Sequence, residues 1–467
     1  MRKTKIVCTI GPKTESLEAL KKLAKAGMNV ARLNFSHGTY EEQGKKIKNL
    51  KELNQHLKNP IAILLDTKGP EIRTGDLKND ISLKKGDTFT FSVKDTTDIE
   101  MGTTLSYRQI VDHIKKGDMI YVDDGMLEFQ VKEINGHNII CKVKNDGILC
   151  SRKGVNVPGI EVDLPSLTEK DIEDISFGIL HDVDFIAVSF VKHKNDIIKL
   201  RKFLKEKGAS TQIIAKIEHI KAVNDFNEIL EVSDGIMVAR GDLGLQMPFE
   251  EIPMIQKEII EKCNALGKPV ITATHMLNSM VENPRPTRAE VTDVANAILS
   301  GTDAVMLSQE TAKGKYPIES VEVMSKICIA TERKMPSKVS ATLAKKSATD
   351  IVAQAVALIS ENISSDAILT FTQTGKTASS LSKFRVKSPI YALTPDEKIL
   401  RTTSLMWGVF AHKIAAGYKS TDIMVNDGIE QLKEKGLLKS GNTVIITAGT
   451  QIGVSGTTNL AEVRKIH

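Results

Sequence analysis

The chain has 467 residues, which corresponds to about three domains of ordinary size. Its composition, 41% hydrophobic and 26% charged, is typical of a folded globular protein and excludes a largely disordered, collagen-like or membrane-bundle chain. The net charge of +6 is small for this length, and Lys is interleaved with Glu along most segments, so we expect anionic small ligands and no nucleic acid.

The N-terminal region predicts neither a secretory nor a membrane segment. Its apolar stretch Ile6–Ile10 is shorter than the 7–15 residues or so that a secretory signal needs, and no run of about 18 apolar residues occurs in the chain. We therefore expect a cytoplasmic protein with no membrane partner. The five cysteines are widely spaced and form no CxxC pair, which argues against a zinc knuckle and a disulfide framework.

Short β-branched runs recur along the chain, each followed by a polar residue and then by a segment of helical periodicity. The runs are Ile6–Ile10, Val30–Leu33, Ile61–Leu65, Phe185–Ser189, Ile213–Ile217, Gly235–Ala239, Val270–Thr274 and Ala304–Leu307. Fully apolar strands that alternate with helices predict a parallel sheet covered on both faces. Eight such units favour an α/β fold of the (β/α)8 TIM-barrel type over its main rival, an open doubly wound sheet. One helix is expected to begin at a capping box, Thr287 with Glu290, and to end at Gly301.

Residues 70–166 interrupt this pattern. Alternating apolar and polar runs are separated there by GD, DDG and NG dipeptides, which are typical of hairpin turns. The runs are Thr88–Val93, Met119–Val122, Leu127–Val131 and Ile139–Val143. We interpret 70–166 as an inserted all-β lid domain, a small β-barrel, which leaves 1–69 and 167–342 as the catalytic (β/α)8 barrel. The insertion follows the third strand, on the face of the barrel where active sites lie.

Residues 343–467 predict a C-terminal α/β domain. Its expected strands are Ala367–Phe371, Ile390–Leu393 and Thr443–Thr447, with a helix at Asp422–Lys435 and a final run at the C-terminus. The motif TQTGKT (372–377) ends like a P-loop, but Thr370 stands where the first glycine is required, so it is not a Walker A motif.

Polar residues follow six of the barrel strands, at carboxyl ends that converge on one pocket. They are Arg32, Asn34, Ser36, Asp66, Thr67, Lys216, Glu218, Arg240, Asp242, Thr272, Thr274, His275, Ser308 and Glu310. Any one of them could form a structural ion pair, and His275 could equally be a structural histidine. So many together predict a functional site.

The residue types at these positions suggest phosphate chemistry. Glu218 and Asp242 are oxygen donors suited to Mg²⁺. Bound phosphates require positive charge, which Arg32, Arg73, Lys153 and Lys216 supply. A further set of residues carries side-chain oxygen atoms but only one formal charge: Asn34, Ser36, Asp66 and Thr67. This composition is more typical of a monovalent-cation site than of a second site for a divalent cation.

Over essentially the whole chain the sequence resembles the pyruvate kinases, in particular the bacterial members activated by fructose-1,6-bisphosphate. The segments that carry the resemblance are KTKIVCTIGP (3–12), GMNVARLNFSHG (27–38), ILLDTKGPEIRTG (63–75), KGVNVPG (153–159), IIAKIE (213–218), DGIMVARGDLG (234–244), KPVITAT (268–274), NPRPTRAE (283–290) and GTDAVMLS (301–308). The resemblance implies transfer of the phosphoryl group of phosphoenolpyruvate to ADP, giving pyruvate and ATP. It implies a catalytic barrel, a lid domain and a C-terminal effector domain.

The resemblance also implies roles for individual residues. Mg²⁺ would bind to Glu218 and Asp242, and K⁺ to Asn34, Ser36, Asp66 and the Thr67 carbonyl. Lys216 would stabilise the phosphoryl group during transfer. Phosphoenolpyruvate would be positioned by Arg32, Lys216, Gly241, Asp242 and Thr274, and the nucleotide by Arg73, Lys153, Asn34 and His37. Arg32 and Arg73 would contact phosphates, and protonation of the enolate would use Thr274, Ser308 and Glu310.

Two positions depart from the family pattern, and a third position supports a dependence on K⁺. His275 stands where members usually have Gln, and it could alter the pH dependence of the reaction. Gln309 replaces a usual Gly and could crowd the backbone near Ser308. Glu71 resembles the K⁺-dependent members, since K⁺-independent ones carry Lys there.

The C-terminal domain carries two segments, TQTGKT (372–377) and SGTT (455–458), that resemble the sugar-phosphate effector loops of fructose-1,6-bisphosphate-activated members. The expected effector residues are Thr372, Thr374, Lys376, Thr377, Ser455, Gly456 and Thr457. The resemblance further implies a homotetramer, and we expect no additional C-terminal domain of the kind some bacterial members carry.

Two alternatives remain open at this stage. One is another phosphoenolpyruvate- or oxaloacetate-handling Mg²⁺ barrel, such as a lyase, which ADP dependence would distinguish. The other is a non-catalytic effector- or nucleic-acid-binding protein that lost activity through the departures at 275 and 309. The retained Lys216, Glu218, Asp242 and Thr274 argue against it.

Overall fold

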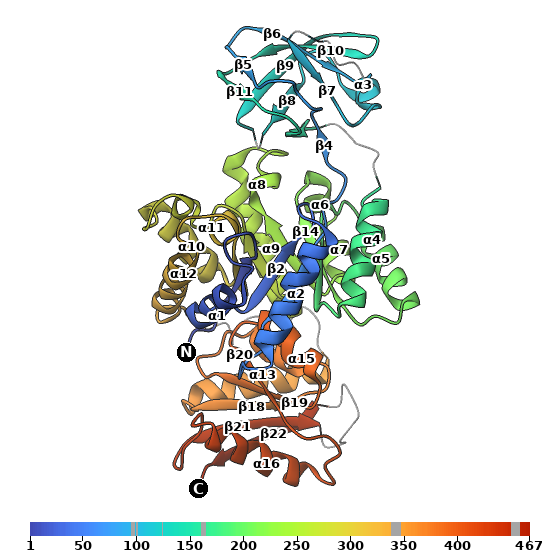
Figure 1. The fold of residues 1–467 in the computed structure, drawn as a ribbon. Helices are drawn as coiled ribbons and strands as arrows, with labels where there is room; N and C mark the ends of the chain where they lie inside the picture. The colour runs from blue at the N-terminus through green and yellow to red at the C-terminus, as the bar shows by residue number, and fades with distance from the viewer. Residues whose placement is uncertain (95–98, 100, 124, 160–164, 338–346, 450–457) are drawn as a thin grey trace.

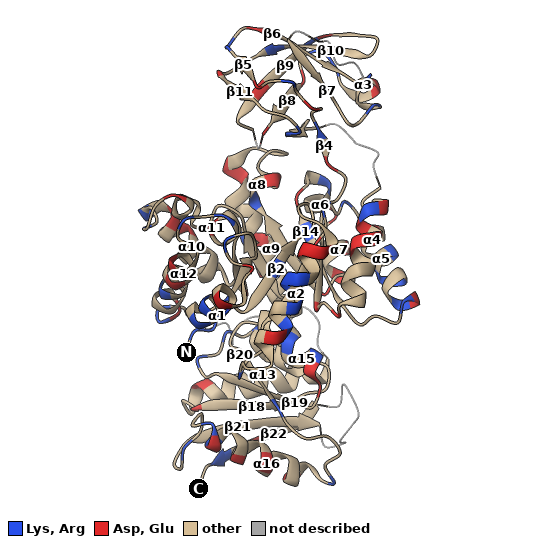
Figure 2. Ribbon diagram, viewed as in Figure 1, with Lys and Arg blue, Asp and Glu red and all other residues tan. Residues whose placement is uncertain are grey.

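The computed structural model describes residues 1–94, 99, 101–123, 125–159, 165–337, 347–449 and 458–467. Three parts lie along one axis: an all-β domain at one end, a central barrel, and an α/β domain that contains the C-terminus at the other end (Figure 1). Among the described residues, no helix is long and apolar enough to cross a membrane. Lys and Arg are interspersed with Asp and Glu on helices such as α2, α4 and α5, so these helices carry charges of both signs (Figure 2).

The central part is a closed barrel of eight parallel strands in the order β1-β17-β16-β15-β14-β13-β3-β2. The strands are β1 (Lys5–Thr9), β2 (Val30–Asn34), β3 (Ala62–Asp66), β13 (Phe185–Val188), β14 (Gln212–Ile217), β15 (Gly235–Ala239), β16 (Val270–Ala273) and β17 (Ala304–Leu307). The predicted TIM barrel is therefore confirmed, and every strand lies within one residue of its expected position.

The barrel is stabilised by burial of apolar side chains on both faces of its strands. On β1, Val7 points into a core inside the barrel that also contains Met237 and Ile271, whereas Ile6 and Cys8 belong to the larger core between strands and helices. This alternation of inner and outer layers is what a filled barrel requires.

Long helices cover the outside of the barrel, and short ones follow the carboxyl ends of its strands. They are α1 (Leu17–Ala26), α2 (Tyr40–Asn54), α4 (Glu169–Leu180), α5 (Lys194–Glu206), α6 (Ile220–Asn224), α7 (Phe226–Val232), α8 (Arg240–Leu243), α9 (Ile252–Leu266), α10 (Arg288–Ser300), α11 (Gln309–Ala312) and α12 (Pro317–Glu332), with 3₁₀ turns at Phe249–Glu251 and Asn278–Val281. The capping box expected at Thr287 and Glu290 begins α10, and Gly301 ends it in the left-handed conformation, φ 103°.

In its described residues, the inserted domain has nine strands and one short helix. They are β4 (Ile72–Arg73), β5 (Ile81–Leu83), β6 (Thr88–Ser92), β7 (Gly102–Thr104), α3 (Ile110–His113), β8 (Met119–Val122), β9 (Leu127–Asn135), β10 (Asn138–Val143), β11 (Gly147–Leu149) and β12 (Gly154–Asn156). Seven form one sheet with β4 and β7 at its edges. A bridge between Thr74 and Leu105 joins these two edges, so the sheet closes as a small β-barrel around Phe89, Phe91 and Phe129. The domain lies beyond α8 and α6, at the carboxyl end of the central strands (Figure 1).

The C-terminal domain is a five-stranded sheet in the order β20-β19-β18-β21-β22, with an antiparallel last strand. Its elements are α13 (Ala348–Asn362), β18 (Ala367–Phe371), α14 (Lys376–Ser382), β19 (Ile390–Thr394), α15 (Glu397–Thr402), a 3₁₀ turn at Thr403–Leu405, β20 (Val409–Lys413), α16 (Thr421–Glu434), β21 (Thr443–Gly449) and β22 (Thr458–Lys465). Strand β20 was not predicted from the sequence. This five-residue strand lies at the sheet edge and ends in an exposed Lys413, so it lacks the apolar run that marks the other strands.

Two arginines tie the C-terminal domain to the barrel. Arg385 is 1% exposed; its two terminal nitrogens each lie 3.0 Å from an oxygen of Asp303, and it also donates to the Gly301 carbonyl at 2.6 Å. Arg401 of α15 donates to Asp184 Oδ1 through Nε and to Asp182 Oδ2 through Nη2, both at 2.7 Å. The other oxygen of Asp184 accepts the Ile63 N–H at 2.8 Å, so this pair reaches directly into β3.

The Asp184 carboxyl makes stability depend on pH. Burial raises its pKa to about 6, although Arg401 opposes the shift. A carboxyl whose pKa is raised in the folded protein favours folding at low pH, and this contribution is lost as pH rises from about 4 to 6. Between pH 5 and pH 7.5 the wild type should therefore lose about 1–2 kcal/mol of unfolding free energy that Asp184→Asn does not lose. Urea unfolding of both proteins at the two pH values measures this difference in pH dependence.

The control for this comparison is Asp182→Asn. The Asp182 side chain binds the same arginine but is 57% exposed, so its substitution should leave the pH profile close to that of the wild type. Parallel profiles for wild type and Asp184→Asn would contradict the assignment of the pH dependence to Asp184.

Candidate functional site

The carboxyl ends of the barrel strands bring four of the predicted residues into direct contact. Asp66 at the end of β3 binds both Arg32 of β2, with Nε 2.6 Å from Oδ2, and Lys216 of β14, with Nζ 3.0 Å from Oδ1. Lys216 Nζ lies 2.9 Å from Glu218 Oε1. The result is a buried cluster of two cations and two carboxylates at the mouth of the barrel.

Electrostatics keep this cluster charged. Burial by itself would lower the pKa of Lys216, but Asp66 and Glu218, helped by Asp242, raise it above its ordinary value. Burial would likewise raise the pKa of Asp66, yet Arg32 and Lys216 lower it. Lys216 is therefore a fixed positive charge at physiological pH, 10% exposed and directed at the mouth of the barrel.

Two residues of the cluster were missed by the sequence analysis. Ser189, directly after β13, accepts a hydrogen bond from Lys216 Nζ at 2.6 Å and donates to the Thr67 carbonyl at 2.6 Å. Thr9, at the end of β1, accepts a hydrogen bond from Arg32 Nη1 at 2.9 Å. Both follow the same strand-end rule as the residues that were found, and applying it to strands one and four would have identified them.

Glu218 and Asp242 supply two carboxylates at this end of the barrel. One oxygen of Glu218 accepts the Phe190 N–H at 2.7 Å and the other faces Lys216, while Asp242, in α8, is near enough to Lys216 to raise its pKa. Within the described ranges, no three His, Cys, Asp or Glu residues gather as metal ligands. Two carboxylates suit Mg²⁺, which commonly takes one or two from the protein and completes its shell with phosphate and water oxygens.

The oxygen-bearing residues suggested for K⁺ lie on neighbouring strand ends. Asn34 and Asp66 are opposite each other in the register of β2 and β3. Asn34 Oδ1 accepts the Ser36 N–H at 3.0 Å, and the carboxylate of Asp66 is bound by Arg32 and Lys216. Thr67 is held against Ser189 through its carbonyl and hydroxyl. The amide, hydroxyl and carbonyl oxygens of this set are suitable ligands for a monovalent cation.

The loop after β16 has a strained backbone. Thr274 and His275 both have positive φ, 66° and 54°, which is uncommon for residues with a Cβ. Arg240 stabilises this turn by donating to the Ala273 carbonyl at 3.2 Å and the Thr274 carbonyl at 2.6 Å. The Thr274 hydroxyl consequently accepts the Gly241 N–H at 2.8 Å, which places both residues at the mouth of the barrel.

The last two strand-end loops are connected by Glu310, which is 2% exposed. Its carboxylate accepts the Ser308 N–H at 2.7 Å and the Leu277 N–H at 3.1 Å, so in this structure it positions backbone. Gln309 begins α11 with its side chain exposed. Thr272 is fully buried and hydrogen-bonded to Thr302, away from the mouth of the barrel.

Two predicted phosphate-binding residues lie in the inserted domain and are paired there. Arg73 Nε and Nη2 lie 2.9 and 2.7 Å from Glu71 Oε2, and Lys153 Nζ is 2.9 Å from Asp123. Burial and then the charge of Arg73 lower the pKa of His37, which places Arg73 near the rim of the barrel. The structure does not bring Arg73 and Lys153 into contact with the Lys216 cluster in the described residues.

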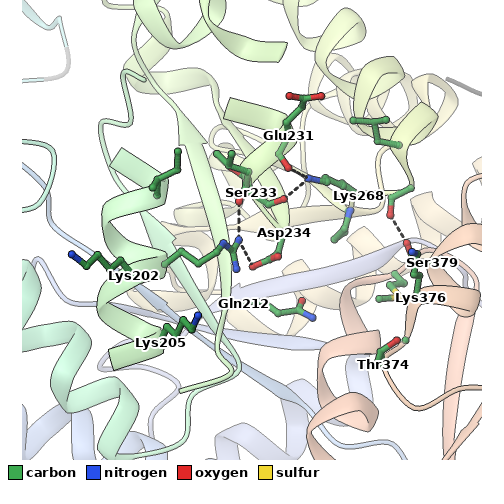
Figure 3. Close-up of a pocket in the computed structure, with 18 residues that line it drawn as sticks. Lys202, Lys205, Gln212, Glu231, Ser233, Asp234, Lys268, Thr374, Lys376 and Ser379 are labelled. Atoms are coloured by element: carbon green, nitrogen blue, oxygen red, sulfur yellow. Dashed lines mark hydrogen bonds and ion pairs between the residues drawn. The ribbon is translucent and has the colours of Figure 1, made fainter. Parts of the chain in front are cut away.

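The predicted effector residues face different ways. Thr372 accepts the Gly375 N–H at 3.0 Å and shapes the loop, and Thr377 is buried against Thr458, with 2.7 Å between the hydroxyls. Thr374 and Lys376 are exposed in a cleft between the C-terminal domain and the barrel (Figure 3). The remaining three predicted residues, Ser455, Gly456 and Thr457, lie outside the described residues.

Comparisons with known proteins agree along the whole chain. Residues 1–321 match the family model of the pyruvate kinase barrel domain, and residues 350–464 match that of the pyruvate kinase alpha/beta domain. The chain is 49% identical over 471 residues to a pyruvate kinase of Bacillus licheniformis, an alignment that covers 99% of this chain and 80% of the relative. It is 48% identical over 473 residues to a pyruvate kinase of Geobacillus stearothermophilus, an alignment that covers 100% of this chain and 80% of that relative. The pyruvate kinase of Staphylococcus aureus strain MRSA252 is 46% identical over 473 residues, covering 100% and 81%.

Proposed function

The chain belongs to the pyruvate kinase family, and from this premise we propose that it transfers the phosphoryl group of phosphoenolpyruvate to ADP with the assistance of Mg²⁺ and K⁺. The observation that carries the proposal is Lys216, a buried and permanently charged ammonium held by Asp66, Ser189 and Glu218 at the mouth of the barrel. A phosphoryl group in transit carries dispersed negative charge, and a cation fixed in advance stabilises that charge without reorganisation.

Arg32 supports the same step from the opposite side of Asp66. Its Nη1 and Nε are held by Thr9 and Asp66, so the guanidinium has a fixed direction at the barrel mouth, where it can bind the phosphate of phosphoenolpyruvate. Gly241 and Thr274, joined by their hydrogen bond, form the adjacent wall for the rest of the substrate.

Two cations fit the residues present. Glu218 and Asp242 would hold Mg²⁺, which when bound neutralises phosphate charge and orients oxygen atoms for in-line transfer. Asn34, Ser36, Asp66 and the Thr67 carbonyl would hold K⁺ on the other side of Lys216. The chain's own contribution is to keep Lys216, Arg32 and these oxygen donors in one rigid arrangement.

The enolate that remains after transfer must gain a proton at carbon. Thr274 and Ser308 end neighbouring strands β16 and β17, and Glu310 holds the backbone of both loops. We therefore assign the proton relay to Thr274, Ser308 and Glu310, with the Glu310 carboxylate also holding the backbone at Ser308. Arg73, Lys153, Asn34 and His37 would contact the nucleotide when the inserted domain approaches the barrel.

The proposal is tested by measuring pyruvate formation from phosphoenolpyruvate and ADP with Mg²⁺, in four assays with and without K⁺ and fructose-1,6-bisphosphate, each repeated without ADP and without Mg²⁺. Turnover that requires both ADP and Mg²⁺ is the expected result. No turnover in any of the four assays would overturn it, and turnover without ADP would indicate a lyase or hydrolase instead.

The dependence on K⁺ is tested at Glu71, whose carboxylate binds Arg73. We expect Glu71→Lys to reduce the requirement for K⁺, because it brings a fixed positive charge close to the nucleotide-binding residues. The ratio of turnover with and without K⁺ is the measurement, and Glu71→Gln is the control because it removes the negative charge without adding a positive one. An unchanged ratio in Glu71→Lys would show that the cation requirement is governed elsewhere.

Activation by a sugar phosphate is the proposed role of the loop at 372–377. We expect Lys376→Glu to abolish activation by fructose-1,6-bisphosphate and to leave the basal rate unchanged, because Lys376 is exposed and lies in the C-terminal domain, outside the catalytic site. Activation curves at subsaturating phosphoenolpyruvate measure the effect, with Lys387→Glu as a control on another loop of the same domain. Normal activation of Lys376→Glu would remove this lysine from the effector site.

We also propose that the chain forms a homotetramer. Apolar side chains on and before α9 and at the end of α10 are unusually exposed, among them Phe249 at 81%, Met254 at 67% and Leu299 at 44%. An apolar surface of this kind marks an interaction site. The expected particle is four times the 51.2 kDa chain mass, which light scattering can measure. A cytoplasmic location stays a prediction of the sequence.

A further inference from the structure

A large cleft opens between the barrel and the C-terminal domain, at the end of the barrel opposite the catalytic mouth. Its volume is about 810 Å³, within the range of small-molecule sites. Gln212 begins β14, Asp234 precedes β15 and Lys268 precedes β16, so the floor is built from the amino-terminal ends of the strands. Thr374, in the loop after β18, and Lys376, the first residue of α14, form the facing wall (Figure 3).

The barrel wall is one face of helix α5. Its lining residues Ile198, Arg201, Lys202 and Lys205 have the i, i+3, i+4, i+7 spacing that places side chains on the same side of a helix. The cleft as a whole is lined by five basic and only two acidic side chains: Arg201, Lys202, Lys205, Lys268 and Lys376 against Glu231 and Asp234. It is therefore a positively charged site.

Two of the five cations serve the structure of the floor. Arg201 Nη2 donates to the Val232 carbonyl at 2.8 Å and to Asp234 Oδ2 at 3.0 Å. Lys268 Nζ donates to the carbonyls of Leu230, Glu231 and Ser233 at 2.5, 2.8 and 2.6 Å, and so closes the end of α7. These contacts make the floor rigid and bind one of its two acidic groups.

The other three cations remain available to a ligand. Lys202 has only a distant contact with Glu206, 3.9 Å, and its side chain is 79% exposed. In the part of the chain that the structure describes, Lys205 and Lys376 have no acidic partner within ion-pair distance. Lys205 and Lys376 come from opposite walls of the cleft (Figure 3). The hydroxyl of Thr374 and the amide of Gln212 lie between these two lysines as further donors (Figure 3).

The two walls are held at a fixed separation. The Ser379 hydroxyl of α14 donates to the Gly267 carbonyl at the end of α9, so the C-terminal wall is attached to the barrel beside the cleft. A ligand does not have to draw the domains together, because the site is already formed. Preformed charged donors that face one another bind multiply charged anions best.

We propose that this cleft binds a compact phosphate-bearing polyanion that bridges Lys202 and Lys205 of the barrel and Lys376 of the C-terminal domain. The inference goes beyond the effector loop proposed above, because it assigns half of the site to a barrel helix. It shares Thr374, Gly375 and Lys376 with that loop and does not depend on the catalytic proposal.

The test measures acetylation of individual lysines by mass spectrometry, on the full chain, with inorganic pyrophosphate as the probe at up to about 10 mM, where even weak binding is detected. We expect pyrophosphate to slow acetylation of Lys202, Lys205 and Lys376. Lys199, an exposed α5 lysine outside the cleft, and Lys207, which directly follows α5, should react at the same rate with and without it. Equal rates at Lys202, Lys205 and Lys376 with and without the probe would overturn the proposal.

A pair of variants then tests whether the two walls act together. Lys202→Gln/Lys205→Gln should raise the pyrophosphate concentration needed to protect Lys376 by about tenfold or more, because hydrogen bonds to charged groups are among the strongest in a site. Lys199→Gln/Lys207→Gln makes the same change of charge on the same segment and should leave the protection of Lys376 intact. Undiminished protection of Lys376 in the Lys202/Lys205 variant would show that the barrel wall takes no part.

The outcome is separable from that of the effector proposal. Activation by fructose-1,6-bisphosphate is measured by turnover, whereas protection by pyrophosphate is read at each lysine without any reaction. In the wild-type chain, protection of the lysines by pyrophosphate without any activation by fructose-1,6-bisphosphate would count against the effector role alone. Activation without protection would count against the bridging site alone.

Discussion

Lys216→Met is expected to lower the rate of phosphoryl transfer by a factor of about 10³–10⁵, the range found when a cation that acts on a transferring phosphoryl group is removed. The expectation follows from the position of Lys216 Nζ, within 3.0 Å of Asp66 and Glu218 and raised in pKa by both. In the proposed mechanism the ammonium acts on charge that develops in the transition state, so its loss should reduce kcat far more than it weakens substrate binding. Rapid-quench measurement of ATP formation in a single turnover isolates the step.

Two measurements separate this effect from simple damage to the fold. Mg²⁺ binding, followed with Mn²⁺ as a paramagnetic substitute, should be largely retained, because Glu218 and Asp242 are unchanged. Ser189→Ala removes a hydrogen-bond partner of Lys216 but keeps its charge, and it should cost about tenfold at most. Turnover of Lys216→Met within tenfold of the wild-type rate would exclude the lysine from the transfer step.

Arg385→Met is expected to lower the free energy of unfolding by about 3–5 kcal/mol, because it leaves Asp303 as a buried charge without its partner. Arg385 binds both oxygens of Asp303 at 3.0 Å, and the two side chains are 1% and 6% exposed. Methionine fills a similar volume, so the loss is electrostatic and not the result of a cavity. Urea unfolding followed by tryptophan fluorescence is suitable, since the single tryptophan, Trp407, donates its backbone N–H to the same aspartate at 3.2 Å.

A second substitution in the same background distinguishes charge from packing. Arg385→Met combined with Asp303→Asn should recover part of the lost stability, because the amide carries no buried charge. The Val270 and Trp407 N–H groups bind different oxygens of Asp303, so the amide oxygen can still accept one of them. Arg285→Met, at an exposed arginine, is the control and should change stability by less than about 0.5 kcal/mol. Equal stability of the single and double variants would show that Asp303 carries no uncompensated charge.

Local patterns in the sequence were sufficient for the architecture of the barrel. A barrel strand is apolar on both faces, so each of the eight strands was visible as a short run such as Ala304–Leu307, bounded by polar residues. The parallel arrangement then requires the following residues to share one face of the barrel. For this reason Arg32, Asp66, Lys216 and Glu218 could be grouped before any distance was known.

Only the tertiary structure decided how these groups are paired and which others join them. Ser189 enters the cluster because β13 lies beside β14, and Asp303 meets Arg385, 82 positions away, because two domains are in contact. The left-handed turn at Thr274 depends on Arg240 reaching its carbonyl, and the basic cleft depends on α5 facing the loop before α14. Sequence periodicity reports which face of an element is apolar. It carries no information about which distant side chain compensates a buried charge, because that depends on packing across the whole chain.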